Sequence, residues 1–330
     1  MSASALLYCA GGGIGDSLVA SVVARALRSR FSRVDALSLP SHRSTLERCA
    51  DIDEVLVDQG DVEGMAGELR ERGYDACAVT WATARAAQIV TRAKIPIRVG
   101  QARRLYSRSF THRVLVRSER GDVTSPWVDV LLDYARALDC DVSDRIPSFV
   151  PSAQDHADAQ ALLAKLNVER FIIMHPTNAI APQRGIWPTQ GWSALARALR
   201  ERFDVPVLVS GSSADRTINE AIVAESEATS IAGELGIGAF GALAQRASAF
   251  VGITTGSMHV AAAVGAPTVG IFPFQSDFPE RWAPMGRSTG VVRASFRCHP
   301  GDTKETCADY ACIANLDVPR IVAAVSALLA

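Results

Sequence analysis

The chain has 330 residues, 48% of them hydrophobic, and its 34 basic and 35 acidic residues leave a net charge of −1. This length suits two domains of about 100–150 residues each, and the composition is that of a globular protein with a sizeable core. The near-zero charge excludes a global attraction to nucleic acid, so we expect no nucleic-acid partner.

The first half alternates short apolar runs with amphipathic stretches, which predicts a parallel sheet covered by helices. Residues 5–10 form a predicted strand that enters a glycine-rich segment, 11–16. A helix follows to about residue 30, with apolar residues such as Leu18 and Val22 at helical spacing. The further predicted elements of this half are strands at 34–39, 54–57, 76–80 and 95–99 and a closing helix at 127–138.

A change of composition separates the two halves. Residues 140–155 carry Pro147, Pro151 and several Asp and Ser residues, which predicts an interdomain linker. The pattern therefore predicts an α/β protein of two Rossmann-like, parallel-sheet domains, 1–150 and 151–330, facing a central cleft where ligands of open α/β sheets bind. The elements predicted for the second half are strands at 171–175, 205–210, 249–253 and 268–272 and helices at 191–203, 214–226, 237–246 and 318–329.

The glycine-rich segment 11–16 (GGGIGD) is superficially similar to a dinucleotide fingerprint. The third glycine of that fingerprint falls on Asp16, where a carboxylate would face the pyrophosphate, so we expect no NAD site. A carboxylate at the end of a strand suits a general base on a sugar hydroxyl. Asp also satisfies amides at helix starts, so a simple N-cap role for Asp16 is the alternative.

Two segments of the second half have the features of a diphosphate site. Residues 252–267 place a strand, a turn rich in glycine and hydroxyl groups, and a helix of small residues in sequence, and a helix start attracts anions. Residues 175–178 (HPTN) also follow a strand, and Arg184 lies in the loop after them. An ordinary Ser/Thr-capped helix and a solvated surface loop are the alternatives.

The order of these motifs resembles glycosyltransferase family 9, the ADP-heptose:lipopolysaccharide heptosyltransferases. The most specific part is Thr-Gly-x-x-His-x-Ala-Ala-Ala-x-Gly-x-Pro at residues 255–267. The resemblance implies an inverting, metal-independent GT-B enzyme without a cofactor. Its N-terminal domain would hold a lipopolysaccharide-core or related glycan acceptor, and its C-terminal domain a nucleotide sugar, ADP-heptose.

The resemblance also assigns roles to residues. Asp16 matches the catalytic base, with Gly13 and Gly15 beside it on the acceptor side. Asp215 stands where the family usually has Glu near the nucleotide ribose. The donor-side residues that it implies are Thr177, Asn178, Arg184, Asp215, Thr254, Thr255, Gly256, Ser257, Met258 and His259.

Two positions depart from the family pattern, both on the donor side. Thr254 stands where the family usually has an Asp that holds the donor sugar, and Gly185 where it usually has Lys. A GT-B transferase for a different nucleotide sugar and a catalytically inactive sugar-nucleotide-binding paralogue therefore remain alternatives. A nucleotide-sugar epimerase of the same architecture is disfavoured, because it would need no acceptor groove with clustered arginines.

Such a cluster lies between residues 98 and 120, where seven arginines accompany one acid, Glu119. We expect Arg103, Arg104 and Arg108 to bind an anionic glycan or glycolipid acceptor, or the anionic inner face of the membrane. A solvated basic face is the alternative.

The remaining features concern location and metals. No apolar run reaches the roughly 20 residues that span a bilayer, and residues 1–4 lack the basic stretch of a signal peptide. The odd number of cysteines, seven, indicates a reducing cytoplasm, so we expect a cytoplasmic protein with peripheral membrane contact. Cys298, Cys307 and Cys312 do not have a standard zinc spacing, and we expect no metal site.

Overall fold

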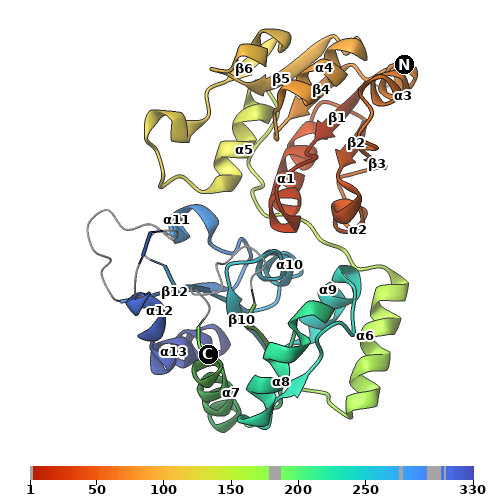
Figure 1. Cartoon of the computed structure of the whole chain (residues 1–330). Helices are drawn as coiled ribbons and strands as arrows, with labels where there is room; N and C mark the ends of the chain where they lie inside the picture. The colour runs from red at the N-terminus through yellow and green to blue at the C-terminus, as the bar shows by residue number, and fades with distance from the viewer. Residues whose placement is uncertain (1–2, 178–186, 275–277, 296–305, 308–309) are drawn as a thin grey trace. The chain divides into compact units, whose positions relative to one another are not determined.

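The computed structural model describes residues 3–177, 187–274, 278–295, 306–307 and 310–330 (Figure 1). The chain divides into two compact units, Met1–Val150 and Pro151–Ala330. Each unit contains a six-stranded sheet with helices on both faces, so the predicted α/β class is confirmed. No helix in these described ranges is both long enough and apolar enough to cross a membrane.

The first unit has the strand order β3-β2-β1-β4-β5-β6, with every neighbouring pair parallel. Helices α1 and α5 pack together on one face, and α3 and α4 cover the other (Figure 1). The elements of this unit are β1 Ser4–Tyr8, α1 Ile14–Leu27, β2 Arg33–Ser38, α2 Arg43–Leu46, β3 Val55–Val57, α3 Val62–Arg72, β4 Ala76–Val79, α4 Ala84–Arg92, β5 Ile97–Gln101, β6 His112–Val114 and α5 Trp127–Arg136.

The second unit has the order β12-β11-β10-β7-β8-β9, again parallel throughout. Helices α7, α8 and α13 share one core with the sheet, and α9 and α10 lie on the other face with α6 against α9. The elements are α6 Ala153–Leu166, β7 Ile172–His175, α7 Thr189–Phe203, β8 Val207–Val209, α8 Arg216–Ala224, β9 Thr229–Ser230, α9 Ile237–Arg246, β10 Ala249–Ile253, α10 Gly256–Ala263, β11 Thr268–Phe272, α11 Pro279–Trp282, β12 Thr289–Arg293, α12 Ala311–Ala314 and α13 Val318–Leu329.

The predicted linker was too long at its C-terminal end. Ser152 is the N-cap of α6, and the Asp155 carboxylate closes a capping box on it, with 2.8 Å between Ser152 N and Asp155 Oδ2. A Ser-x-x-Asp start has the composition of a loop although it begins a helix. The edge strands β6, β9 and β12 were also missed. β6 and β9 are only three and two residues long, and all three strands are only partly covered by other elements.

The strand order determines where each sheet binds ligands. Both sheets have the Rossmann strand order. In the first unit, successive strands are added on one side of β1 and then, from β4 on, on its other side; in the second unit the same change of side lies between β7 and β10. Ligands of open α/β sheets bind beyond the carboxyl ends of the strands at such a switch point. The glycine-rich turn follows β1, and the turn at residues 254–255 follows β10, so both predicted motifs lie at switch points.

Candidate active site

In the first unit, the turn between β1 and α1 holds Asp16 in the third position of the helix. Gly13 is the N-cap, and its amide donates to Asp16 Oδ2 at 2.8 Å. Gly12 has a left-handed φ of +69°, and a Cβ there would lie 2.6 Å from Asp16 Oδ2. The turn therefore needs glycine at position 12, because the carboxylate folds back over it.

The surroundings of Asp16 suit a base. Burial raises the pKa of its carboxyl, while the hydrogen bond from Gly13 and the charge of His42 lower it. A carboxylate whose pKa is raised toward neutrality is a stronger proton acceptor than an ordinary Asp. Asp16 also stabilises the helix start, because its carboxylate accepts from the amide of the N-cap residue Gly13, but it is not the N-cap itself.

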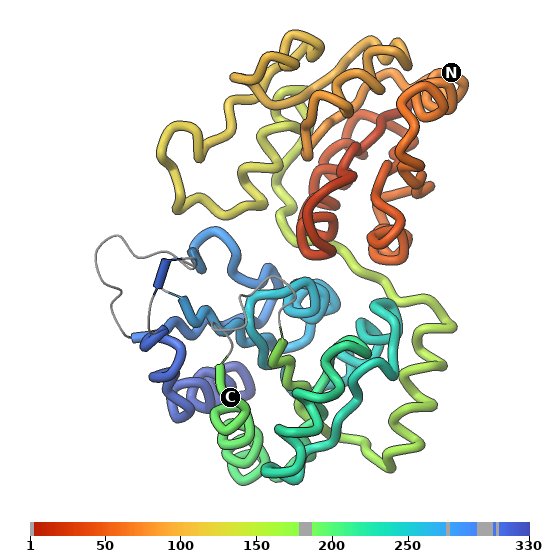
Figure 2. The backbone as a smooth tube through the Cα atoms, in the orientation of Figure 1, coloured from red at the N-terminus to blue at the C-terminus, as the bar shows by residue number. Residues whose placement is uncertain are grey.

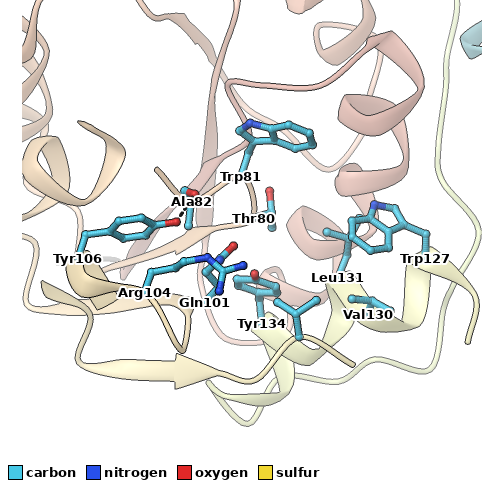
Figure 3. Close-up of a pocket in the computed structure, with 11 residues that line it drawn as sticks. Thr80, Trp81, Ala82, Gln101, Arg104, Tyr106, Trp127, Val130, Leu131 and Tyr134 are labelled. Carbon is cyan, nitrogen blue, oxygen red and sulfur yellow. Dashed lines mark hydrogen bonds between the residues drawn. The ribbon is translucent and has the colours of Figure 1, made fainter. Parts of the chain in front are cut away.

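A pocket of about 350 Å³ lies beside this turn, within the same unit (Figure 3). Trp81, which follows β4, packs directly on the turn, since a Cβ on Gly11 would lie 2.0 Å from Trp81 Cδ1. Aromatic walls with a few convergent polar groups are typical of sites for small ligands. The lining residues are Thr80, Trp81, Ala82, Gln101, Arg104, Tyr106, Val116, Trp127, Val130, Leu131 and Tyr134.

The three arginines predicted to bind the acceptor differ in their surroundings. Arg104 lines the pocket, points toward its aromatic walls in Figure 3, and pairs with Glu119 Oε1 at 2.8 Å. Arg103 and Arg108 instead donate to the backbone carbonyls of Glu119 and Leu105, at 3.2 and 3.0 Å. The segment between β6 and α5 makes a wide backbone loop (Figure 2). Glu119 lies in this segment, in the 3-10 helix Arg117–Arg120. The basic segment therefore brings one of the three into a formed pocket.

In the second unit, the turn between β10 and α10 forms a helix start capped by a hydroxyl group. Thr255 is the N-cap, and its Oγ1 accepts from Met258 N at 3.4 Å. The amides of Gly256 and Ser257 come first in the helix, where N–H groups lack intrahelical partners. Met258 is fully buried and contributes packing, so its predicted role at the ligand is limited to the backbone. Thr254 donates its amide to Ile271 O at 3.2 Å.

His259 lies in the same turn and is 7% exposed. Its Nδ1 has no hydrogen-bond partner within the described ranges, and burial lowers its pKa to about 4. The ring is therefore neutral at physiological pH, and any contact with a ligand would be that of an uncharged imidazole.

The end of β7 lies next to this turn, since His175 pairs with Gly252 of β10. A Cβ at Gly252 would lie 2.9 Å from His175 O, so the two backbones approach closely. Thr177, the predicted phosphate contact, is nine-tenths buried at the end of this strand. His175 is neutral, with its pKa lowered by burial to about 4, and its Nδ1 lies 2.9 Å from Ser210 Oγ.

The remaining predicted donor residues divide into two groups. Asp215 Oδ2 accepts from Ser212 N at 2.7 Å in a capping box, so this carboxylate stabilises the turn after β8. Asn178, Arg184 and Gly185 lie outside the described residues, as does Cys298.

Of the other two cysteines, Cys307 is half-buried and Cys312 is buried. Within the described ranges, no three His, Cys, Asp or Glu side chains gather as metal ligands would.

Sequence reasoning missed Trp81, Trp127 and His42, which adjoin the turn or the pocket. Their only local signal was position, because Trp81 and His42 each follow the carboxyl end of a predicted strand. The strand order brings these side chains close to Asp16 and to the pocket, and sequence spacing does not reveal the strand order.

Two parallel Rossmann sheets with glycine-rich turns at their switch points are the GT-B architecture of glycosyltransferases. The profile of glycosyltransferase family 9 (heptosyltransferase) matches residues 64–311, and the chain belongs to this family. This confirms the resemblance found in the sequence. The matched range begins after Asp16.

Individual relatives agree with this assignment. Lipopolysaccharide heptosyltransferase 1 of Pseudomonas aeruginosa is 27% identical over 175 residues, which are 53% of this chain and 46% of that relative. The alignment thus spans less than half of the curated relative. A family 9 glycosyltransferase of Veillonella parvula has a similar structure, with a TM-score of 0.85 at 16% identity, covering 99% of this chain and 97% of the other. The ADP-heptose lipopolysaccharide heptosyltransferase II of E. coli has a TM-score of 0.78 at 20% identity, covering 99% and 98%.

Proposed function

We propose that this protein is an inverting glycosyltransferase that transfers heptose from ADP-heptose to a lipopolysaccharide-core or related glycan acceptor, with Asp16 as general base. The observation that carries the proposal is the Asp16 carboxylate, which burial makes more basic and which lies in a turn directly against Trp81 of the aromatic pocket. Family membership and the names of its relatives supply the reaction class.

The proposed reaction is a direct displacement. Asp16 takes the proton of the acceptor hydroxyl as that oxygen bonds to the anomeric carbon of the donor. The bond from that carbon to the diphosphate oxygen breaks, and inversion follows from attack on the opposite face. The negative charge that develops on the departing diphosphate is stabilised by the first amides of α10, at Gly256 and Ser257. No divalent cation is part of this scheme.

The donor site would lie at the switch point of the second unit. Thr177 and the start of α10 offer hydroxyl and amide donors for the diphosphate, and His259 offers a neutral ring. We assign Asn178 and Arg184 to the same site from the resemblance. We also assign Asp215 to the nucleotide ribose from the resemblance. Its carboxylate accepts from Ser212 N and can accept a further hydroxyl bond.

The acceptor site would lie in the first unit. A sugar ring can pack on the aromatic walls, and Arg104 provides the cation for an anionic substituent. We assign Gly13 and Gly15 to the acceptor side from the resemblance. Arg103 and Arg108, which are exposed, would contact acceptor lipid or the cytoplasmic face of the inner membrane.

A thermal-shift panel of nucleotide sugars, followed by mass spectrometry of a deacylated core oligosaccharide after incubation, tests the proposal. A ligand at a hundred times its Kd stabilises the native state by about 2.7 kcal/mol. We expect ADP and ADP-heptose to raise Tm, heptose to be added to the oligosaccharide, and the addition to continue in EDTA. Stabilisation without any sugar transfer would identify an inactive binding paralogue instead.

Thr254 favours a second candidate, transfer of a different sugar. A neutral hydroxyl replaces the carboxylate expected to hold the donor sugar. Stabilisation by another nucleotide sugar, with no response to ADP-heptose, would select this candidate.

A further inference from the structure

His42 lies against the helix start that carries Asp16. It ends the short 3-10 helix Pro40–His42, which follows β2, the strand next to β1. Its side chain is 4% exposed, and its Nδ1 lies 2.8 Å from Ser17 Oγ, which is fully buried. Ser17 directly follows Asp16 in the first turn of α1. The imidazole therefore fixes the backbone turn from which the carboxylate projects.

Asp16 and His42 also affect each other electrostatically. The Asp16 charge raises the pKa of His42 against the larger, lowering effect of burial. The His42 charge lowers the pKa of Asp16 against the larger, raising effect of burial. The other charged groups of the packed elements are engaged elsewhere, since Arg43 pairs with Glu47 within α2 at 2.6 Å and Arg25 of α1 pairs with Asp51 at 3.0 Å.

We propose that His42 is a positioning residue for the base Asp16, holding the first turn of α1 through Ser17 and supporting the charged form of the carboxylate. This inference rests on the proposed role of Asp16. The acceptor proton ends on Asp16, and His42 acts through the orientation and charge of that carboxylate. The pH dependence of turnover thus depends in part on His42, which lies just after the neighbouring strand β2.

Two substitutions separate the two parts of this role. His42→Asn places an amide near the position of Nδ1, so the contact with Ser17 can persist while the titrating ring is lost. His42→Phe removes both. At acidic pH, where His42 is protonated, the imidazolium favours the Asp16 anion. Both variants remove this cation, so the acidic limb of the kcat profile should move to higher pH in both. His42→Phe should also lose up to about 10²-fold in kcat through misplacement of the base, with ADP affinity unchanged.

His112 provides a matched control. Its Nδ1 lies 3.0 Å from Thr111 Oγ1, a similar bond, but on the exposed edge strand β6. His112→Asn should leave the pH profile unchanged. A wild-type profile in both His42→Asn and His42→Phe would overturn the inference, and if His42→Phe fails to fold, the profile of His42→Asn decides alone.

A measurement without turnover separates this inference from the proposed function. In ¹⁵N-imidazole NMR titrations of the full chain, Asp16→Asn should lower the pKa of His42, because the carboxylate that favours the imidazolium is gone. Ser17→Ala should shift the Nδ1 resonance. An unchanged His42 titration in Asp16→Asn overturns the coupling, whereas full turnover in Asp16→Asn overturns the role of Asp16 as base.

Discussion

The helix starts of α1 and α10 each follow a central strand at the switch point of a parallel sheet, but they have opposite electrostatic character. At α1 the N-cap is Gly13, and a carboxylate, Asp16, takes its amide. At α10 the N-cap is the neutral Thr255, which takes one amide with its hydroxyl. Both starts have a buried histidine nearby, His42 and His259.

This difference separates the two chemical roles. A helix start attracts anions through its dipole and its unpaired amides. At the start of α1, the carboxylate of Asp16 already occupies the position that an anion would take. This carboxylate repels phosphate and is able to accept a proton. At α10 the first amides retain their positive field for a phosphate. Under the proposed function, a helix start at a switch point would thus serve a base in the first unit and a leaving group in the second.

Removing the charge at α1 should have the largest effect. Asp16→Asn keeps a side chain that can cap the helix, so folding and ADP affinity should persist while turnover falls by about 10²–10⁴-fold. Asp61→Asn is the matched control, because Asp61 caps α3 in the same unit, accepting from Gly64 N at 2.6 Å. Normal turnover in Asp16→Asn, with only stability lost, would reduce Asp16 to a capping residue.

Adding a negative charge at the start of α10 tests whether this helix start binds the diphosphate. Thr255→Asp keeps a good N-cap but places a carboxylate where the diphosphate would bind, so ADP affinity should fall by about tenfold, or about 1.4 kcal/mol. Thr83→Asp controls for the substitution, since Thr83 caps α4 and accepts from Ala86 N at 3.0 Å. Calorimetry with equal ADP affinity in both variants would exclude α10 as the phosphate site.

A smaller effect is expected on the acceptor side. Replacing Arg103, Arg104 and Arg108 with Ser should raise the acceptor KM several-fold without changing ADP affinity, and the difference should shrink as salt rises, because the Debye length is about 8 Å at physiological ionic strength. Arg104→Ser alone should account for most of the change in KM, since Arg104 lines the pocket. The other two should mainly weaken binding to anionic vesicles. Unchanged kinetics and vesicle binding in the triple variant would leave only a solvated basic face.

The smallest effect concerns Thr254. Charge-assisted hydrogen bonds are roughly twice as strong as neutral ones, so a Thr should hold the donor sugar more weakly than the family's Asp. ADP should then bind within about tenfold of ADP-heptose, a gap of about 1.4 kcal/mol or less. Thr254→Asp should change the preferred sugar more than it changes ADP binding. An ADP-sugar bound a thousandfold more tightly than ADP would contradict this.

Local pattern was sufficient for much of the molecule. The predicted helix at 318–329 matches α13, and most long strands lie within two residues of their predicted bounds, because apolar periodicity and helix-capping residues act over a few positions. The same reasoning placed Asp16 after the first strand. It missed α6 and the edge strands β6, β9 and β12, whose polar starts and half-exposed residues have the composition of loops.

The tertiary structure decided what surrounds each predicted residue. The order β2-β1-β4 brings His42 and Trp81 to the turn at Gly11 and Asp16 from 25 or more positions away. It also separated Arg104, which lines the pocket, from Arg103 and Arg108, which do not. Strand pairing depends on burial across the whole sheet and joins residues far apart in the chain. The sequence alone therefore determined the turns and the position of Asp16 in one of them, and only the folded sheet determined their neighbours.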